Sequence, residues 1–448
     1  MPPRLRIVRP LWPLLACGLL SARIALAAAA PGASAMPPLL ESLVLLLLGA
    51  LLGGAAFARM GQPAVLGELL AGVVLGNLPL LGVHGLEALR APGVIDTFAQ
   101  VGVLFLLFQT GLASDVRQMA AVGRSALLVA VLGVVAPMLL GFAASRMFFP
   151  EHALLMHVFV GATLAATSVG ITARVLRDLG RTNSVEGRII LGAAVIDDVL
   201  GLIVLAVVTG VITAADPGRA FSAATVVTIL AKAFAFLAAA LLLGRWLSRA
   251  AFRAASRLQG DGLLLTLALV FCFTLAWLAA LAGLAPIIGA FAAGLVLEEV
   301  HYADLLARER HAKSLEELLE PLTGFLAPLF FVLVGLRVDL GAFSNPGMLA
   351  FAAVLTLAAI AGKQVCSLGV LERGADRVAV GLGMIPRGEV GLVFAGIGSG
   401  LMLSGQPVVD PGVFSAVVVM VVLTTLLTPP LLAWRLGRRP APAGSSRS

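Results

Sequence analysis

Two adjacent acidic residues stand near the middle of a long apolar run. Asp197 and Asp198 lie in the sequence AAVIDDVLGL, whose other residues are all uncharged. An ionisable side chain within a membrane span costs several kcal/mol, so it is a candidate for a functional role. Neighbouring helix positions point about 100° apart, so the two carboxylates face different surroundings. We therefore expect one acid to bind an ion or a proton and the other to be held by a partner.

Lys363 is the candidate partner. It lies in another apolar run, AIAGKQV, and is one of three lysines in the chain. A lysine buried without a counter-ion tends to lose its proton, so a nearby carboxylate is expected. We predict that Asp197 pairs with Lys363, while Asp198 faces a cavity where protons and a monovalent cation compete for it. A purely structural ion pair is the alternative, but one lysine cannot neutralise two acids.

Two further polar segments interrupt apolar runs. The segment ATLAATSVG is rich in small and hydroxyl residues, and Thr167 and Ser168 offer oxygen ligands for a hard cation. The segment MIPRGEVG breaks a helix with its proline and glycine, and Arg387 and Glu389 are expected to neutralise one another and the half-helix ends. Broken backbone at membrane depth is tolerated only where it lines a cavity or is buried in protein. We therefore predict two discontinuous helices that cross at the site.

The composition is that of a membrane protein. The chain has 448 residues, of which 60% are hydrophobic and 12% charged, and its mean hydropathy is +1.04. The charged fraction is about half that of a soluble domain. Apolar runs of about 20 residues, long enough to cross a bilayer, predict an all-α fold with thirteen spans within residues 36–434. These spans are residues 38–58, 63–79, 94–112, 122–147, 154–176, 187–213, 220–246, 262–283, 285–299, 317–337, 347–371, 378–403 and 411–434.

Basic residues predict the orientation. With a periplasmic mature N-terminus, twenty arginines and lysines fall in cytoplasmic segments and four in periplasmic ones, as the positive-inside rule expects. Residues 1–35 indicate a signal peptide, because three arginines precede an apolar run that ends in a small-residue cleavage site. Met36 as the true start and a lipoprotein signal at Cys17 are alternatives. Residues 435–448 are expected to form a cytoplasmic tail, and the bacterial inner membrane is the expected location.

Three sequence matches at a nearly constant offset predict an internal repeat. They pair GELLAGVVL at Gly67 with GAFAAGLVL at Gly289, GLASD at Gly111 with GLRVD at Gly335, and SVGI at Ser168 with EVGL at Glu389. The offset maps spans 1–6 onto spans 8–13 and leaves residues 220–246 as a linker helix. A shift of seven spans reverses the second copy in the membrane. Inverted six-helix repeats of this kind are typical of secondary transporters.

Other classes of function are less well supported. No nucleophile with a neighbouring base is found at membrane depth, so we expect no enzyme and no cofactor. The three cysteines have no metal-binding or redox spacing. The net charge of +7 comes from basic residues spread over short loops, so no nucleic-acid partner is expected.

The motifs resemble those of the second monovalent cation:proton antiporter family, which includes Kef-type potassium exporters and sodium/proton antiporters with an Asp-Asp pair. The resemblance covers residues 38–434. It rests on GQPAVLGE from Gly61, ATSVGITARVL from Ala166, the acids Asp197 and Asp198, Lys363, and PRGE from Pro386. The second and last of these motifs are the most specific. Kef-type proteins commonly carry a cytosolic regulatory domain, which we do not expect in the few residues after the last span.

The resemblance implies a homodimer that works as an elevator. A core of residues 122–213 and 347–434 would slide against a dimer and scaffold part of residues 38–112 and 262–337. Asp198 matches the acid that binds the cation and the proton, with Asp197, Thr167 and Ser168 as further candidate ligands. Asp197 and Lys363 match the family's salt-bridge pair, and the Asp-Asp pair goes with electrogenic exchange.

The identity of the exchanged ion stays open. The Asp-Asp pair favours Na⁺ or Li⁺ exchanged for H⁺, and K⁺/H⁺ exchange is the first alternative. A sodium-coupled symporter of an organic anion would need a larger polar cavity. A non-transporting ion sensor would need an output element. The proposed partners are therefore a monovalent cation, protons, the lipid bilayer and a second copy of the chain.

Overall fold

The computed structural model describes residues 36–82, 93–113, 123–214, 223–255, 262–297, 314–403 and 406–437. The predicted signal peptide and most of the predicted tail lie outside these residues. The chain divides into two units, Met1–Leu45 and Leu46–Ser448, and the contacts below belong to the second. Its described part is helical except for a short hairpin of β1 (Met402–Leu403) and β2 (Gln406–Pro407).

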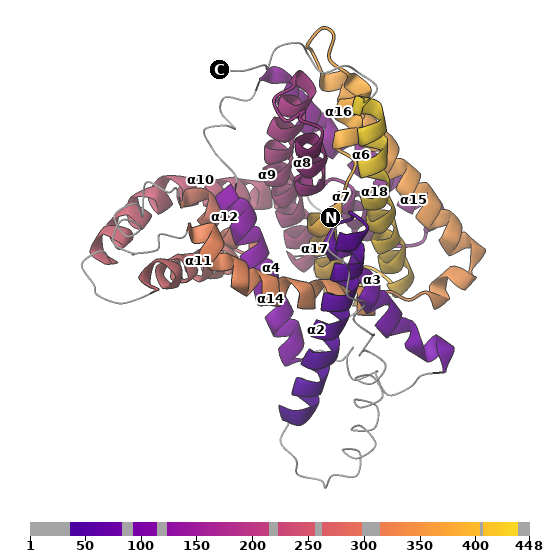
Figure 1. Cartoon of the computed structure of the whole chain (residues 1–448), viewed down its shortest axis with the longest axis horizontal. Coiled ribbons are helices and arrows are strands. Elements are labelled where there is room, and N and C mark those ends of the chain that lie inside the picture. The colour runs from indigo at the N-terminus through magenta and orange to yellow at the C-terminus, as the bar shows by residue number, and fades with distance from the viewer. Residues whose placement is uncertain are drawn as a thin grey trace, which may run out of the picture. The chain divides into compact units, whose positions relative to one another are not determined.

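The helices follow the predicted spans closely (Figure 1). The first predicted half contains α2 (Met36–Arg59), α3 (Ala64–Asn77), η1 (Leu78–Leu81), α4 (Val94–Ala113), α6 (Arg124–Phe148), α7 (Leu154–Thr163), α8 (Val169–Asp178) and α9 (Val185–Ala214). The linker is α10 (Ala223–Ala255). The second half contains α11 (Leu263–Leu281), α12 (Pro286–Val296), α14 (Leu315–Leu336), η4 (Gly341–Ser344), α15 (Pro346–Val365), η5 (Cys366–Gly369), α16 (Arg377–Gly383), α17 (Gly388–Gly398) and α18 (Pro411–Gly437).

The all-helical membrane class is confirmed. The described residues contain 9 helices long and apolar enough to cross a membrane, and up to 10 when the bent pair α16–α17 is taken as one span. Three shorter apolar helices fall within other predicted spans. The count of thirteen spans therefore stays a prediction, although each predicted range contains a described helix.

Glycines bring α3, α4, α12 and α14 into close contact, and we call these four helices the scaffold group. A methyl group at Gly72 of α3 would overlap the carbonyl oxygen of Val332 in α14. A methyl group at Gly294 of α12 would overlap the carbonyl oxygen of Phe108 in α4. Small residues at helix interfaces allow this approach in membranes, where packing rather than hydrophobic burial drives association. The scaffold group is thus held by backbone contacts that leave no room for a larger side chain.

The glycine contacts exchange partners between the two predicted halves. The repeat predicts that Gly72 corresponds to Gly294 and that Gly111 corresponds to Gly335. In the structure Gly72 packs against Gly335, and Gly294 packs against Gly111. Replacing each glycine of the Gly72–Gly335 contact by its counterpart in the other half gives the Gly294–Gly111 contact. A two-fold relation between the halves requires this equivalence.

Two further contacts join residues to their own counterparts. Gly102 packs against the backbone of Leu326, its equivalent at the offset of GLASD and GLRVD. The Ser168 hydroxyl bonds to the Glu389 carboxylate, its equivalent at the offset of the third sequence match. Such contacts are expected on the axis of a two-fold relation. The inverted repeat itself stays a prediction, which these contacts support.

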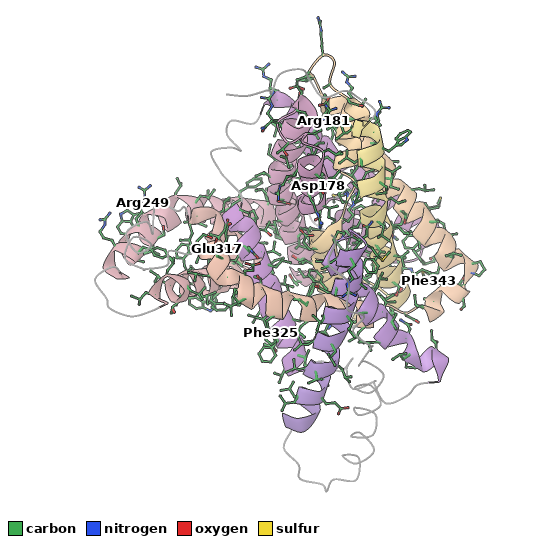
Figure 2. The ribbon with its side chains drawn as sticks, viewed as in Figure 1. Asp178, Arg181, Arg249, Glu317, Phe325 and Phe343 are labelled. Carbon is green, nitrogen blue, oxygen red and sulfur yellow. The ribbon has the colours of Figure 1, made fainter. Side chains whose placement is uncertain are left out.

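Polar contacts collect the helix ends into two groups. In the first group, the Arg435 guanidinium donates to the Asp376 carboxylate, and the backbone N–H of Asp376 donates to the Glu186 carboxylate. Arg181 donates to the carbonyl oxygen of Leu436, and Figure 2 labels it together with Asp178, the last residue of α8. All of these residues belong to segments that the charge distribution assigns to the cytoplasm.

The second group contains only segments assigned to the periplasm. The Arg337 guanidinium lies 2.7 Å from an Asp96 carboxylate oxygen. His152 lies 2.9 Å from Asp410 and joins the α6–α7 connection to the start of α18. The helix ends therefore fall into the two groups that the predicted topology expects. The assignment of each group to a cellular side stays a prediction.

A matched pair of substitutions in α14 tests the glycine packing. Gly335→Ala would insert a methyl group against the backbone of α3, and we expect it to lower the free energy of unfolding by about 1–3 kcal/mol. Gly324→Ala adds the same group to the same helix where nothing lies within 4 Å, and should leave stability unchanged. Thermal unfolding of the detergent-purified proteins measures both. Equal melting temperatures for the two variants would contradict the packing described here.

Candidate ion-binding site at two broken helices

Two helices are interrupted in the interior of the protein. Helix α7 ends at Thr163 and α8 begins at Val169, while α16 ends at Gly383 and α17 begins at Gly388 at an angle of 47°. The backbone N–H of Ser168 donates to the carbonyl oxygen of Pro386 at 2.8 Å and so joins the two breaks directly. The predicted discontinuous helices are therefore present, and their irregular segments meet.

Local chemistry explains the second break. A proline at position 386 has no N–H to continue the hydrogen bonding of α16. Gly388 has φ +33°, which side chains disfavour, and a methyl group there would overlap the side chain of Ser168. The Thr172 hydroxyl donates to the carbonyl oxygen of Gly383 at 2.7 Å, where the last turn of α16 leaves acceptors free.

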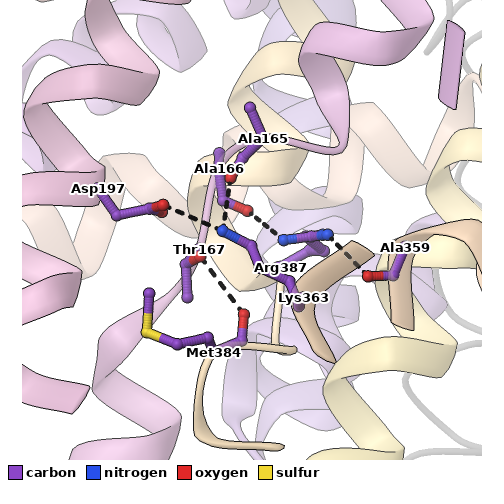
Figure 3. A network of polar contacts seen from close by, with 8 residues as sticks. All are labelled: Ala165, Ala166, Thr167, Asp197, Ala359, Lys363, Met384 and Arg387. Carbon is purple, nitrogen blue, oxygen red and sulfur yellow. Dashed lines mark hydrogen bonds and ion pairs between the residues drawn. The ribbon is translucent and has the colours of Figure 1, made fainter. Parts of the chain in front are cut away.

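Two buried cations occupy the carbonyl oxygens of the first break (Figure 3). The ammonium of Lys363 donates to the carbonyl oxygen of Ala165 at 2.9 Å. The guanidinium of Arg387 donates to the carbonyl oxygens of Ala166 at 3.0 Å and Ala359 at 3.2 Å. Both side chains have 0% exposure. They lie just past the C-terminus of α7, where the helix dipole favours positive charge.

The structure brings Asp197 and Lys363 together as an ion pair. The ammonium lies 3.0 Å from Asp197 Oδ1, and both side chains have 0% exposure. The second oxygen, Oδ2, is buried and has no hydrogen-bond donor among the described residues. Asp197 thus keeps one acceptor free beside a fully enclosed ion pair.

Asp198 lies in different surroundings. Its side chain is only half-buried, and within the described ranges no hydrogen bond or ion pair to its carboxylate is found. The next residue, Val199, faces a narrow apolar gap that is also lined by Ile288 and Phe291 of α12. The two neighbouring acids are therefore one enclosed carboxylate with a partner and one partly buried carboxylate without a partner among the described residues.

The hydroxyl residues of the first break connect the two broken helices. Ser168 Oγ donates to Glu389 Oε2 at 2.7 Å, and Thr167 Oγ1 lies 3.4 Å from the carbonyl oxygen of Met384. Neither hydroxyl is bonded to Asp198. Their use as cation ligands stays a prediction, and the contacts made in this conformation are structural.

The expected pairing of Arg387 with Glu389 is absent. In the part of the chain that the structure describes, Arg387 donates only to the two backbone carbonyls given above, and Glu389 accepts from Ser168. Glu389 lies in the first turn of α17, where the helix dipole stabilises a carboxylate. Each residue therefore compensates a helix end rather than its neighbour, which corrects half of the prediction.

Two residues that support the site were not singled out in the sequence. Thr172 binds the end of α16, and Thr425 Oγ1 accepts from the backbone N–H of Gly388 at 3.2 Å, at the start of α17. The sequence signal that could have identified them is a polar residue within an apolar run. Thr425 stands in VVLTTLLTPP, and its hydroxyl is fully buried in α18.

A membrane protein with buried charges where two broken helices meet has the architecture of a secondary transporter. The family model for the transmembrane sodium/hydrogen exchangers matches residues 43–435, so the chain belongs to that family.

Similar proteins extend over nearly the whole chain. The high-affinity Na⁺/H⁺ antiporter NhaS3 of Synechocystis is 36% identical, with 95% of this chain and 94% of that protein covered. The Na⁺/H⁺-K⁺ antiporter GerN of Bacillus cereus is 33% identical, with 89% and 96% covered. The solved sodium proton antiporter MjNhaP1 of Methanocaldococcus jannaschii has a similar fold, with a TM-score of 0.65 at 17% identity over 89% of this chain and 97% of that one.

Removal of Lys363 tests the buried ion pair. We expect Lys363→Gln to lower the free energy of unfolding by about 3–5 kcal/mol, because the Asp197 carboxylate would remain buried without a counter-ion. The double variant Lys363→Gln with Asp197→Asn should recover most of this loss, since no net charge is then left unpaired. The control is Lys232→Gln on the exposed surface of α10. A single variant as stable as this control would contradict the pairing, and thermal unfolding distinguishes the cases.

Proposed function

We propose that this protein exchanges protons for a monovalent cation, with Na⁺ or Li⁺ preferred, and that Asp198 is the shared binding group. The observation that carries the proposal is the contrast between two adjacent acids, one paired with Lys363 and one, partly buried, with no partner among the described residues. A proton and a cation cannot occupy one carboxylate at the same time. Competition for that carboxylate is therefore sufficient to couple proton transport to cation transport.

The charge of the site supports one bound cation at a time. Asp197, Asp198 and Glu389 supply three negative charges, and Lys363 and Arg387 supply two positive ones, which leaves a net charge of −1 in this enclosed region. One proton or one monovalent cation on Asp198 brings the sum to zero. A buried site moves through a low-dielectric barrier at least cost when it is neutral. The empty site is therefore hindered from crossing, as antiport requires.

The free Oδ2 of Asp197 offers a route to electrogenic exchange. A cation bound to Asp198 would be close enough to compete with Lys363 for the neighbouring carboxylate. If Lys363 then released its proton, two protons would leave for each cation and the cation-loaded site would carry −1, so this step is an alternative to the neutral exchange described above. Electrogenic exchange of this kind is what the resemblance to antiporters with an Asp-Asp pair implies.

The movement we propose is of the elevator type, within inverted repeats of thirteen spans. The scaffold group is packed through glycines, while the predicted core of residues 122–213 and 347–434 carries the charged site. Sliding of this core would carry Asp198 past the apolar residues Ile288 and Phe291 of α12. We further propose a homodimer in a bacterial inner membrane, with a periplasmic mature N-terminus.

K⁺/H⁺ exchange is the second candidate. It is favoured by the name of GerN and by a plant K⁺ efflux antiporter that is 29% identical over 67% of this chain. The carboxylate site described here has no feature that excludes K⁺. The choice between the ions rests on the size of the cavity that forms around the bound cation.

Transport by purified protein in liposomes tests the proposed function. With an imposed pH gradient and a pH-sensitive dye, addition of Na⁺ should collapse the gradient in the natural protein. Asp198→Asn removes the titrating group, and its signal should fall to that of protein-free liposomes. Glu151→Gln, at an exposed acid of the α6–α7 turn, should transport normally. Parallel additions of Li⁺ and K⁺ determine selectivity, and an active Asp198→Asn protein would remove Asp198 from the mechanism.

Competition predicts a specific pH dependence. Below the pKa of the shared group, the apparent KM for Na⁺ should rise about tenfold for each unit by which the pH falls, because a proton must leave before the cation binds. The maximal rate at saturating Na⁺ should change much less on the side from which Na⁺ is supplied. Initial rates over a matrix of pH and Na⁺ concentration provide the measurement. A constant KM with a falling maximal rate would indicate separate sites for the two ions.

A further inference from the structure

Arg337 joins three helices outside the ion site. It forms the C-cap of α14, and its guanidinium donates to Asp96 in the first turn of α4 at 2.7 Å. The other terminal nitrogen donates at 3.1 Å to Ser399, which caps the end of α17 and itself bonds to the carbonyl oxygen of Gly396. Arg337 thus ties two helices of the scaffold group to one half of a broken helix.

The bridge stands over an apolar cavity. The cavity has a volume of about 400 Å³ and lies between the scaffold group and α17, with Val103, Ile287, Val334 and Ile397 among its lining residues. Asp96 and Arg337 also line it, and their side chains are 19% and 37% exposed. The polar bridge therefore spans the two groups of helices that line this apolar gap.

The predicted repeat places counterparts of this bridge at the opposite helix ends. At the offsets of the sequence matches, Arg337 corresponds to Ala113, Asp96 to Glu320, and Ser399 to Asp178. The arginine is replaced by alanine, while the other two positions are acidic. Glu320 and Asp178 are both exposed. At the opposite end Asp178 lies 4.0 Å from Arg174 of its own helix, and among the described residues no arginine or lysine joins Asp178 to Glu320.

We infer that Arg337 is a one-sided latch that holds the transport pathway closed at its own end. The inference rests on the proposed alternating access, in which the two halves exchange conformations. Closure at the Arg337 end gains two charge-assisted hydrogen bonds. Closure at the opposite end would bring Glu320 and Asp178 together without an arginine at the position equivalent to Arg337, which is Ala113. The difference biases the protein toward the state that opens away from Arg337, which the charge distribution assigns to the cytoplasm.

The latch can be tested without measuring transport. A cysteine at Ile397, in a background with the native cysteines replaced by serine, reports access to the cavity. A membrane-impermeant maleimide is applied separately to each face of membrane vesicles. Arg337→Gln should raise the labelling rate from the Arg337 face about tenfold, the effect expected for loss of a charge-assisted bond. Arg146→Gln is the matched control, because among the described residues Arg146 donates a hydrogen bond only to the nearby carbonyl oxygen of Pro150.

A gain of function gives the sharper test. Ala113→Arg would supply the equivalent of Arg337 at the opposite end, where it could join Glu320 to Asp178. It should also raise labelling at Ile397→Cys from the Arg337 face, although it lies at the other end of α4, whereas Ala113→Gln should not.

Each outcome decides the inference. Unchanged labelling in both arginine variants, or equal increases with Arg146→Gln and Ala113→Gln, would overturn the latch. If Arg337→Gln fails to fold, Ser399→Ala removes one of the two bonds and should raise labelling in the same direction. The same measurements in the Asp198→Asn protein separate the two proposals, because the latch predicts altered access even where no ion is transported.

Discussion

The interaction on which the structure depends is the capture of broken backbone by two buried cations. A helix that stops inside a membrane leaves carbonyl oxygens that no water can satisfy. Here Lys363 and Arg387 fill that need, because they donate to the carbonyl oxygens of Ala165 and Ala166. The same groups bring positive charge into the protein interior, and this charge is what permits acidic residues to stand beside it. The broken helices and the buried carboxylates therefore depend on the same two cations. Without Lys363 and Arg387, both the free carbonyl oxygens and the acidic side chains would be destabilising.

This coupling explains why one acid is free. Lys363 is shared between a backbone carbonyl and Asp197, and both terminal nitrogens of Arg387 donate to backbone carbonyls. No positive side chain remains for Asp198 among the described residues, so its charge must be balanced by something that arrives from outside. A site designed only for stability would carry one acid fewer, since replacing a charge with an apolar group of similar size is often neutral or stabilising. The unbalanced acid is thus better explained by ion binding than by the fold.

Much of this arrangement could be predicted because ionisable residues are rare in apolar runs. With so few candidates at membrane depth, Asp197 and Lys363 were natural partners, and the proline before Arg387 marked a helix break. The failure with Arg387 and Glu389 has a physical cause. Sequence shows side-chain charges but not free backbone carbonyls, and these were the acceptors that Arg387 used. The roles of Thr172 and Thr425 were missed for the same reason, since their partners are backbone groups of a segment far away in the sequence. The sequence matches show which glycines correspond in the two halves. They do not show which glycines contact one another.

The repeat also explains why departures from symmetry matter. Two halves with identical sequences would give two conformations, open at opposite ends, with identical free energies. The backbone contacts of the scaffold group keep this symmetry, because Gly72 with Gly335 and Gly294 with Gly111 are equivalent. The charged residues do not keep it. Helix α9 carries two acids within its apolar run where α18 has none. Under the proposed alternating access, the shared scaffold would provide two states, and a small number of unmatched side chains would determine what binds in them and which one is populated.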